Sequence, residues 1–144
     1  MFEILCFRFV FYLYMMEYRI LHGKKLVDFL DWYEAKEGFG GIPFIPCQIL
    51  VVSNEDKDLF MIMLFIPKSS NCAWVGFPIK NPNTTKEETK GGFDFLIQSA
   101  TEYLKGLSFE FIFSTTEIPY VKDTFLNNEF KVTDTNIDLL IKKI

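Results

Sequence analysis

The stretch TTKEETKGGFDFLIQSATEYLKGL, residues Thr84–Leu107, decides the fold. Its polar first half ends in two glycines, Gly91 and Gly92, and its second half carries apolar residues at helical spacing. These apolar residues are Phe93, Leu96, Ile97, Ala100 and Leu104. Strand-like runs flank the unit, Ala73–Ile79 before it and Phe109–Phe113 after it. A strand, glycine loop, helix and strand in this order can direct backbone N–H groups and a helix dipole at a phosphate, although paired glycines also serve in plain turns.

Length and composition indicate one globular domain. A chain of 144 residues can bury a proper core, and a hydrophobic content of 49% with 17 phenylalanines argues against disorder. The formal net charge of −4, without a Lys/Arg cluster, lacks the positive surface that nucleic-acid binding needs. We therefore expect no nucleic-acid partner.

The cysteines indicate neither a metal site nor a disulfide framework. Cys6, Cys47 and Cys72 are odd in number and widely spaced, and the single histidine, His22, completes no familiar zinc spacing with them. His22 follows a predicted strand and is interpreted as a surface or hydrogen-bonded residue rather than a base. Reduced thiols predict a cytoplasmic protein.

The first 16 residues, MFEILCFRFVFYLYMM, are the most apolar part of the chain. They are shorter than the roughly 20 residues of a membrane span, carry Glu3 and Arg8, and lack the pattern of a signal peptide. We therefore predict no membrane partner. The segment is either an extra strand or an extension ahead of a domain spanning 17–144. Its aromatic side chains need a cover, which makes it a candidate homodimer surface.

The rest of the chain alternates between strands and helices. Tyr18–Leu21 predicts a strand, and Lys24–Lys36 predicts an amphipathic helix with its apolar face at Leu26, Phe29, Leu30 and Tyr33. Three apolar runs with short turns then predict an antiparallel meander: Gln48–Val52, Leu59–Ile66 and Ala73–Ile79. A helix is predicted at Tyr120–Asn127, because Pro119 suits a first helical turn. The last two predicted strands are Lys131–Val132 and Asn136–Ile141.

This order of elements resembles the GNAT acyltransferase superfamily over residues 17–144. The motif-level agreement lies at Gly91, Leu96, Ala100, Tyr103, Leu104 and the strand Phe109–Phe113. Glu129-Phe130-Lys131 stands where that family commonly has a Gly-Phe pair. The resemblance implies an α/β (α+β) fold in a single domain. Its central sheet would be mixed, mostly antiparallel and of about six to seven strands, with helices on both faces.

The resemblance also implies a cosubstrate, acetyl-CoA or another acyl-CoA, held where the fourth strand splays from the fifth. The strand edge that would contact it is Phe77–Lys80, with Phe77, Ile79 and Lys80 as candidates. The loop that would hold its pyrophosphate supplies the candidates Glu88, Thr89, Lys90, Gly91, Gly92 and Phe93. The acceptor would be the amine of a small molecule or of a protein.

Two residues of this loop depart from the family pattern. Glu88 replaces the usual basic or amide residue, and Phe93 replaces a second small residue. Lys86 or Lys90 can offset the carboxylate. A rival interpretation is a capping box of Thr85 with Glu88, which would start the helix early and place the glycines inside its first turns.

The candidate catalytic residues follow from the same resemblance. The tyrosine that commonly protonates the departing thiolate falls on Phe125, which has no proton to donate. Tyr120 is the substitute donor or else a core tyrosine, and Glu110 on the fifth strand is the candidate base. Two hypotheses follow: an acyl-CoA-dependent N-acyltransferase acting by direct attack, or a catalytically inactive GNAT-fold protein with a structural or partner-binding role.

Overall fold

A five-stranded sheet forms the centre of the fold in a computed structural model that describes residues 15–36, 41–42, 44–138 and 140–144. The strands lie side by side in chain order, with the first four antiparallel and the last parallel to its neighbour. They are β1 (Met16–His22), β2 (Gln48–Asn54), β3 (Lys57–Phe65), β4 (Cys72–Lys80) and β5 (Phe111–Phe113). The expected mixed, mostly antiparallel sheet is confirmed, with five strands in place of six to seven.

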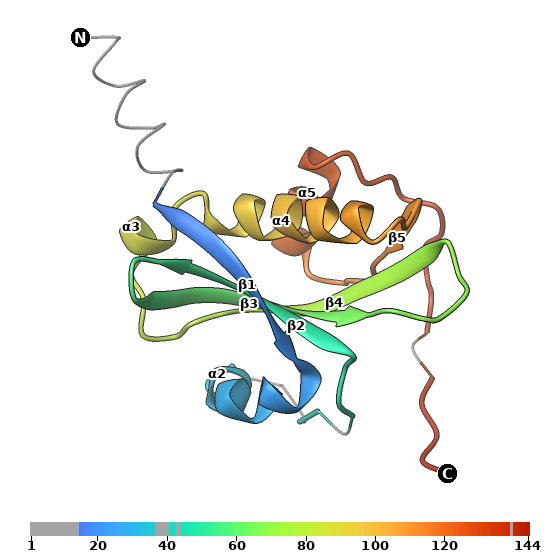
Figure 1. Cartoon of the computed structure of the whole chain (residues 1–144), viewed down its shortest axis with the longest axis horizontal. Helices are drawn as coiled ribbons and strands as arrows, with labels where there is room; N and C mark the ends of the chain where they lie inside the picture. The colour runs from blue at the N-terminus through green and yellow to red at the C-terminus, as the bar shows by residue number, and fades with distance from the viewer. Residues whose placement is uncertain (1–14, 37–40, 43, 139) are drawn as a thin grey trace, which may run out of the picture.

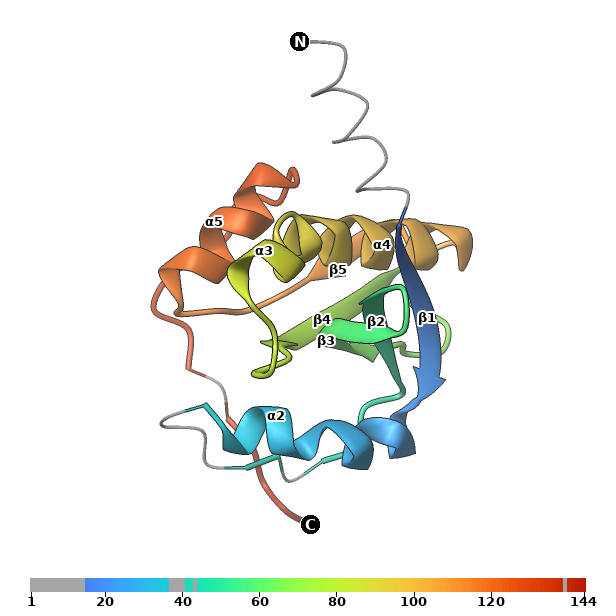
Figure 2. The same ribbon diagram turned by 90° about the vertical axis from the view of Figure 1, so that its left-hand side faces the viewer.

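Helices cover both faces of this sheet, as expected (Figures 1 and 2). One face is covered by the 3₁₀ helix η1 (Gly23–Phe29) and the helix α2 (Leu30–Glu34). On the other face lie α3 (Lys86–Thr89), α4 (Gly92–Gly106) and α5 (Pro119–Asn127). α4 runs along the sheet, and α5 packs beside it.

The two middle strands supply both hydrophobic cores, because successive side chains of a strand point to opposite faces. The α4 side takes Leu50, Val52, Ile62 and Leu64. The α2 side takes Ile49, Val51, Met61 and Met63. All of these residues are 0% exposed. Burial on both faces explains why these strands have nearly continuous apolar sequences rather than alternating ones.

The predicted helix Lys24–Lys36 is wrong in type over its first half. Residues Gly23–Phe29 form a 3₁₀ helix, and only Leu30–Glu34 is α-helical. Side chains three residues apart eclipse in a 3₁₀ helix, and the buried Leu26 and Phe29 follow that spacing onto the α2-side core. The side chain of His22 caps this turn, where Nδ1 accepts a hydrogen bond from the Lys24 N–H at 3.1 Å.

The two predicted C-terminal strands are also wrong, since no strand forms among residues 131–138 and 140–144. Phe130 still packs on Phe125, but beyond it the apolar side chains of Val132, Ile137 and Leu140 are exposed. A strand needs a partner for its backbone hydrogen bonds, and the neighbouring β5 offers only three residues. Local β-propensity was therefore not enough to form the pair.

The apolar N-terminal segment lies almost entirely outside the described residues, so its two interpretations and its candidate role in a homodimer stay predictions. Met16 belongs to β1 and is buried in the core. Within the described part of the chain, none of the helices has the length and apolar character needed to cross a membrane.

Gly92 lets α4 begin very close to β3. A Cβ atom built at Gly92 would lie 2.7 Å from Cε2 of Phe60, whose ring packs against that of Phe93. Real Cβ atoms essentially never come that near, so a side chain at position 92 forces the helix or the ring to move. At Gly106, the last residue of the same helix, the described residues leave open space.

We therefore predict opposite effects for two glycine-to-alanine changes in α4. Gly92→Ala should lower the free energy of unfolding by about 1–3 kcal/mol through overpacking. Gly106→Ala should leave it unchanged or raise it by up to about 1 kcal/mol, because alanine loses less backbone entropy on folding. Urea denaturation of both variants measures the difference, and equal effects would contradict the close packing.

Candidate functional site

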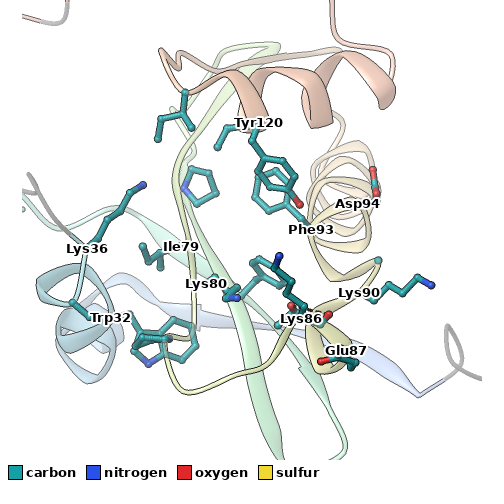
Figure 3. A pocket seen from close by; sticks show the side chains of 18 residues that line it. Trp32, Lys36, Ile79, Lys80, Lys86, Glu87, Lys90, Phe93, Asp94 and Tyr120 are labelled. Atoms are coloured by element: carbon teal, nitrogen blue, oxygen red, sulfur yellow. Dashed lines mark hydrogen bonds between the residues drawn. The ribbon is translucent and has the colours of Figure 1, made fainter.

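The candidate site lies where β4 and β5 separate. The two strands pair only over Cys72–Trp74 and Phe111–Phe113. Beyond this pairing, the end of β4 faces the first turns of α4 and α5 across an open cavity of about 940 Å³ (Figure 3). The cavity is lined by Trp32, Ala35, Lys36, Phe60, Pro78, Ile79, Lys80, Pro82, Lys86, Glu87, Thr89, Lys90, Gly91, Phe93, Asp94, Ile118, Tyr120 and Val121.

A β-bulge in β4 shapes one wall of this cavity. Met61 pairs with Ile79 and Met63 with Gly76, so two residues of β4, Phe77 and Pro78, stand opposite one residue of β3. A bulge bends its strand and increases the local twist. The three residues that line the cavity from β4, Pro78–Lys80, come at the bulge and directly after it.

The opposite wall contains the glycine loop. Thr85 and Glu88 form the capping box that the rival interpretation proposed, but it starts only the single turn α3. Gly91 then adopts a left-handed conformation with φ 75°, and α4 starts anew at Gly92. The first N–H groups of an α-helix have no acceptor within the helix, and they carry the positive end of its dipole. The described part of the chain leaves the space at the Gly91 Cβ position open within 4 Å.

Glu88 is turned toward the sheet and does not line the cavity. Its Oε2 accepts from Lys57 Nζ at 2.7 Å, and its Oε1 accepts from the Thr85 N–H at 3.0 Å. The hydrogen bond from Lys57 and then the one from Thr85 hold the pKa of Glu88 below its ordinary value. The carboxylate that departs from the family pattern is therefore neutralised by a lysine from the β2–β3 hairpin.

Four lysines and two carboxylates line the cavity. Lys36 comes from the end of α2, Lys80 from the end of β4, and Lys86 and Lys90 from the glycine loop (Figure 3). The carboxylates are Glu87 and Asp94, and Oδ1 of Asp94 accepts from Asn128 Nδ2 at 2.9 Å. The balance of four positive against two negative side chains favours an anionic ligand.

Six of the nine predicted cosubstrate residues line the cavity, namely Ile79, Lys80, Thr89, Lys90, Gly91 and Phe93. Glu88 forms the cap, and Gly92 is buried under Phe60. Phe77 points to the α2 side of the sheet, where its ring packs against those of Phe44 and Trp74. The loop and the strand edge thus meet at one cavity, while Glu88, Gly92 and Phe77 have structural roles.

The two predicted catalytic residues, Tyr120 and Glu110, lie in different places. Tyr120 is in the first turn of α5 and lines the cavity, with its ring centroid 5.7 Å from that of Phe93 (Figure 3). Glu110 lies beside Asn71, whose Nδ2 donates to its carboxylate at 2.8 Å. That is the far end of β4, roughly 20 Å from the cavity at about 3.3 Å per residue.

Phe125 is buried in the α4-side core, in contact with the ring of Phe130. It does not line the cavity, so the side chain that the resemblance aligned with the general-acid tyrosine does not face the candidate site.

Comparison with solved structures identifies the architecture. An aminoglycoside acetyltransferase from an uncultured soil metagenomic sample superimposes with a TM-score of 0.66 at 14% identity, covering 90% of this chain and 97% of the other. A GNAT family acetyltransferase from Streptococcus pneumoniae gives 0.58 at 16% identity, covering 90% and 100%. The chain has the GNAT fold. Aminoglycoside N-acetyltransferase AAC(6′)-Iy in complex with CoA gives 0.57 at 10% identity, covering 89% and 94%. No protein-family model and no curated protein sequence matches this chain significantly.

The GNAT fold brings residues to the cavity that the sequence analysis did not single out. Trp32, Ala35 and Lys36 reach it from the end of α2, which forms a separate wall (Figure 3). The sequence predicted only that the apolar face of this helix packs on the sheet. The residues at its C-terminal end lie beside the end of β4 through tertiary packing, and no local pattern predicts that.

We predict a pH-dependent contribution of Glu88 to the stability of this GNAT fold. Because its folded-state pKa is lowered, Glu88 stabilises the fold above its ordinary pKa of about 4.3, and this contribution disappears as the pH falls through the lower folded-state value. Urea denaturation should give the parent protein a higher free energy of unfolding than Glu88→Gln at pH 7. This difference should disappear as the pH is lowered to 3. Glu102→Gln, at an exposed position of α4, controls for the loss of one charge. A difference that does not change with pH would contradict this role.

Proposed function

We propose that this protein binds an acyl-CoA in the cavity and transfers the acyl group to an amine by direct attack. One observation carries the proposal: the free N-terminus of α4 opens, at Gly91, into a cavity between separating strands of a GNAT fold. Backbone N–H groups at such a helix end bind phosphate without specialised side chains. The proposal extends to this chain the class of ligand named in one similar structure, a complex with CoA.

The residues at the glycine loop fit the pyrophosphate of CoA. The open space at Gly91 allows a phosphate to approach the backbone, and Lys86 and Lys90 supply positive charge beside it. The carboxylate of Glu88 is paired with Lys57, while those of Glu87 and Asp94 line the cavity with the four lysines. An acyl-CoA would supply a thioester with an electrophilic carbonyl and a thiol leaving group. The pantetheine arm would lie along Ile79 and Phe93, which are apolar and buried.

Tyr120 is the residue best placed to protonate the leaving thiolate. Among the tyrosines that the structure describes, it is the one that lines the cavity, and its ring is held against Phe93. Glu110 is too distant to accept the proton of the amine. The carboxylates that line the cavity, Glu87 and Asp94, replace it as candidate bases in this proposal.

The charge of the cavity bears on the acceptor. Two of the similar structures are aminoglycoside acetyltransferases, but an aminoglycoside carries several positive charges. Four lysines against two carboxylates oppose a polycationic acceptor. We propose an acceptor with a single amine that is neutral or acidic elsewhere.

A second candidate function is a GNAT-fold protein without turnover, acting through a partner. It is favoured by the placement of Phe125 in the core and of Glu110 far from the cavity, which leaves Tyr120 as the remaining predicted catalytic residue at the site. Calorimetry with acetyl-CoA, followed by a free-thiol release assay with a panel of amines, separates the two functions. Binding with release supports the enzyme, and binding without release supports the second candidate.

The phosphate-binding role of the glycine loop is tested by two substitutions of equal size at Gly91. Aspartate and asparagine both tolerate the left-handed conformation of this residue, and they differ by one charge. Gly91→Asp should weaken CoA binding by at least about tenfold relative to Gly91→Asn, because a carboxylate would face the pyrophosphate. Isothermal titration calorimetry measures both affinities. Equal affinities of the two variants would exclude a phosphate at this position.

Turnover should depend on Tyr120. Tyr120→Phe keeps the ring contact with Phe93 and removes the proton, so kcat should fall by about 10²-fold, at the low end for general acid catalysis. Phe125→Tyr should not raise kcat, and burying a hydroxyl there should cost about 1–3 kcal/mol of stability. The thiol release assay and urea denaturation give these values. Faster turnover in Phe125→Tyr would support the alignment of Phe125 with the general-acid tyrosine and contradict the assignment of Tyr120.

A further inference from the structure

Phe77 has a strained backbone conformation at the β4 bulge. Its φ is 52°, in the left-handed region where a residue with a side chain is disfavoured. The position before a proline, here Pro78, favours extended conformations, which adds to the strain. In a bulge of this kind the left-handed residue is normally glycine. Such strained residues persist only where the surroundings hold them, and they concentrate at functional sites.

Tyr33 holds this residue from the opposite layer. Its hydroxyl donates a hydrogen bond to the Phe77 carbonyl, so a side chain of α2 takes a backbone group of the bulge as its acceptor. Tyr33 is 2% exposed, and burial raises the pKa of its hydroxyl, which keeps the proton in place. Aromatic packing of Phe77 on Phe44 and Trp74 supports the same conformation.

The bulge and α2 are also two walls of the cavity. Pro78 and Ile79 follow Phe77 along β4, and Trp32 precedes Tyr33 on α2. Figure 3 shows Trp32 and Ile79 on the same side of the cavity, facing the glycine loop. The hydrogen bond therefore joins the two elements that carry these residues, one position away from Trp32 and Pro78 and two positions away from Ile79.

We infer that Tyr33 is a positioning residue: it holds the β4 bulge in its strained form and so sets the cavity wall against which the acyl-CoA binds. This inference rests on the proposed function for the identity of its ligand. The effect of Tyr33 on the conformation of the bulge does not depend on that function. If the hydrogen bond is lost, Phe77 can relax toward an extended conformation, and Pro78–Lys80 will then change direction.

The test compares two tyrosines that each donate one hydrogen bond. Tyr33→Phe removes the bond to the bulge, and Tyr103→Phe removes a bond from α4 to Gln48 Oε1, at 2.8 Å and away from the cavity. Tyr33→Phe should weaken CoA binding about tenfold by calorimetry, whereas Tyr103→Phe should change it less than about twofold. In spectra without ligand, the backbone amide signals of the non-proline residues among 76–80 should shift in Tyr33→Phe alone.

A double-mutant cycle with Phe77→Gly separates positioning from general stability. Glycine adopts a positive φ without strain, so the bulge no longer needs to be held. In the Phe77→Gly background, Tyr33→Phe should therefore weaken CoA binding less than about threefold. If Tyr33→Phe alone fails to fold, Phe77→Gly is compared with the double variant Phe77→Gly, Tyr33→Phe instead.

Three results would overturn the inference: equal losses of affinity in Tyr33→Phe and Tyr103→Phe, unchanged signals at residues 76–80, or a full effect of Tyr33→Phe in the Phe77→Gly background. Absence of CoA binding by the parent protein is a different outcome. It would overturn the proposed function and the positioning of its ligand, while the signals of residues 76–80 would still show whether Tyr33 holds the bulge.

Discussion

The parallel pairing of β4 with β5 extends over three residues, and the site exists because it stops there. On the other edge of β4, the antiparallel pairing with β3 continues to Lys80, but only by accommodating a bulge. β4 is thus held along one edge up to Lys80, whereas on the other edge the described strands pair with it only as far as Trp74. That second edge, the first turn of α4 and the first turn of α5 enclose a space that a fully paired sheet would have filled with backbone hydrogen bonds.

Much of this arrangement follows from the sequence, because it depends on the distribution of apolar residues. The runs Ile49–Val52 and Leu59–Leu64 are apolar on both faces, which predicts strands covered by helices on both sides. The spacing from Phe93 to Leu104 predicts a helix on one of those faces. The glycine loop before it lies at the cavity for the same reason: the strand and helix around it are fixed by burial.

The parts that could not be predicted depend on tertiary contacts or on the exact phase of a helix. Tyr120 and Phe125 are five residues apart in α5, a rotation of roughly 140° beyond one turn, so their side chains point in different directions. Tyr120 lines the cavity, and Phe125 lies in the core. The sequence analysis counted residues along the chain and so assigned the general-acid position to Phe125, the buried one of the two. The engagement of Glu88 by Lys57 needs a hairpin 31 positions away in the sequence, and Tyr33 meets Phe77 across 44 positions. The C-terminal strands failed for a related reason, because strand formation requires a partner strand.

The connection between β4 and β5 has a consequence for how the chain folds. β1 to β4 pair with their sequence neighbours through antiparallel contacts, and two of these pairs are joined by short turns. β5 can reach β4 only after α4 has crossed the sheet, so this contact closes the longest loop among the strand pairs of the described sheet. Three paired residues offset little of the entropy cost of closing this loop. This edge is therefore the part of the sheet that forms late in folding and opens early in native-state fluctuations. A molecule held between β4 and α4 would therefore bind to the least stable unit of the fold. By mass action, it would lower the fraction of molecules in which this edge of the sheet is open.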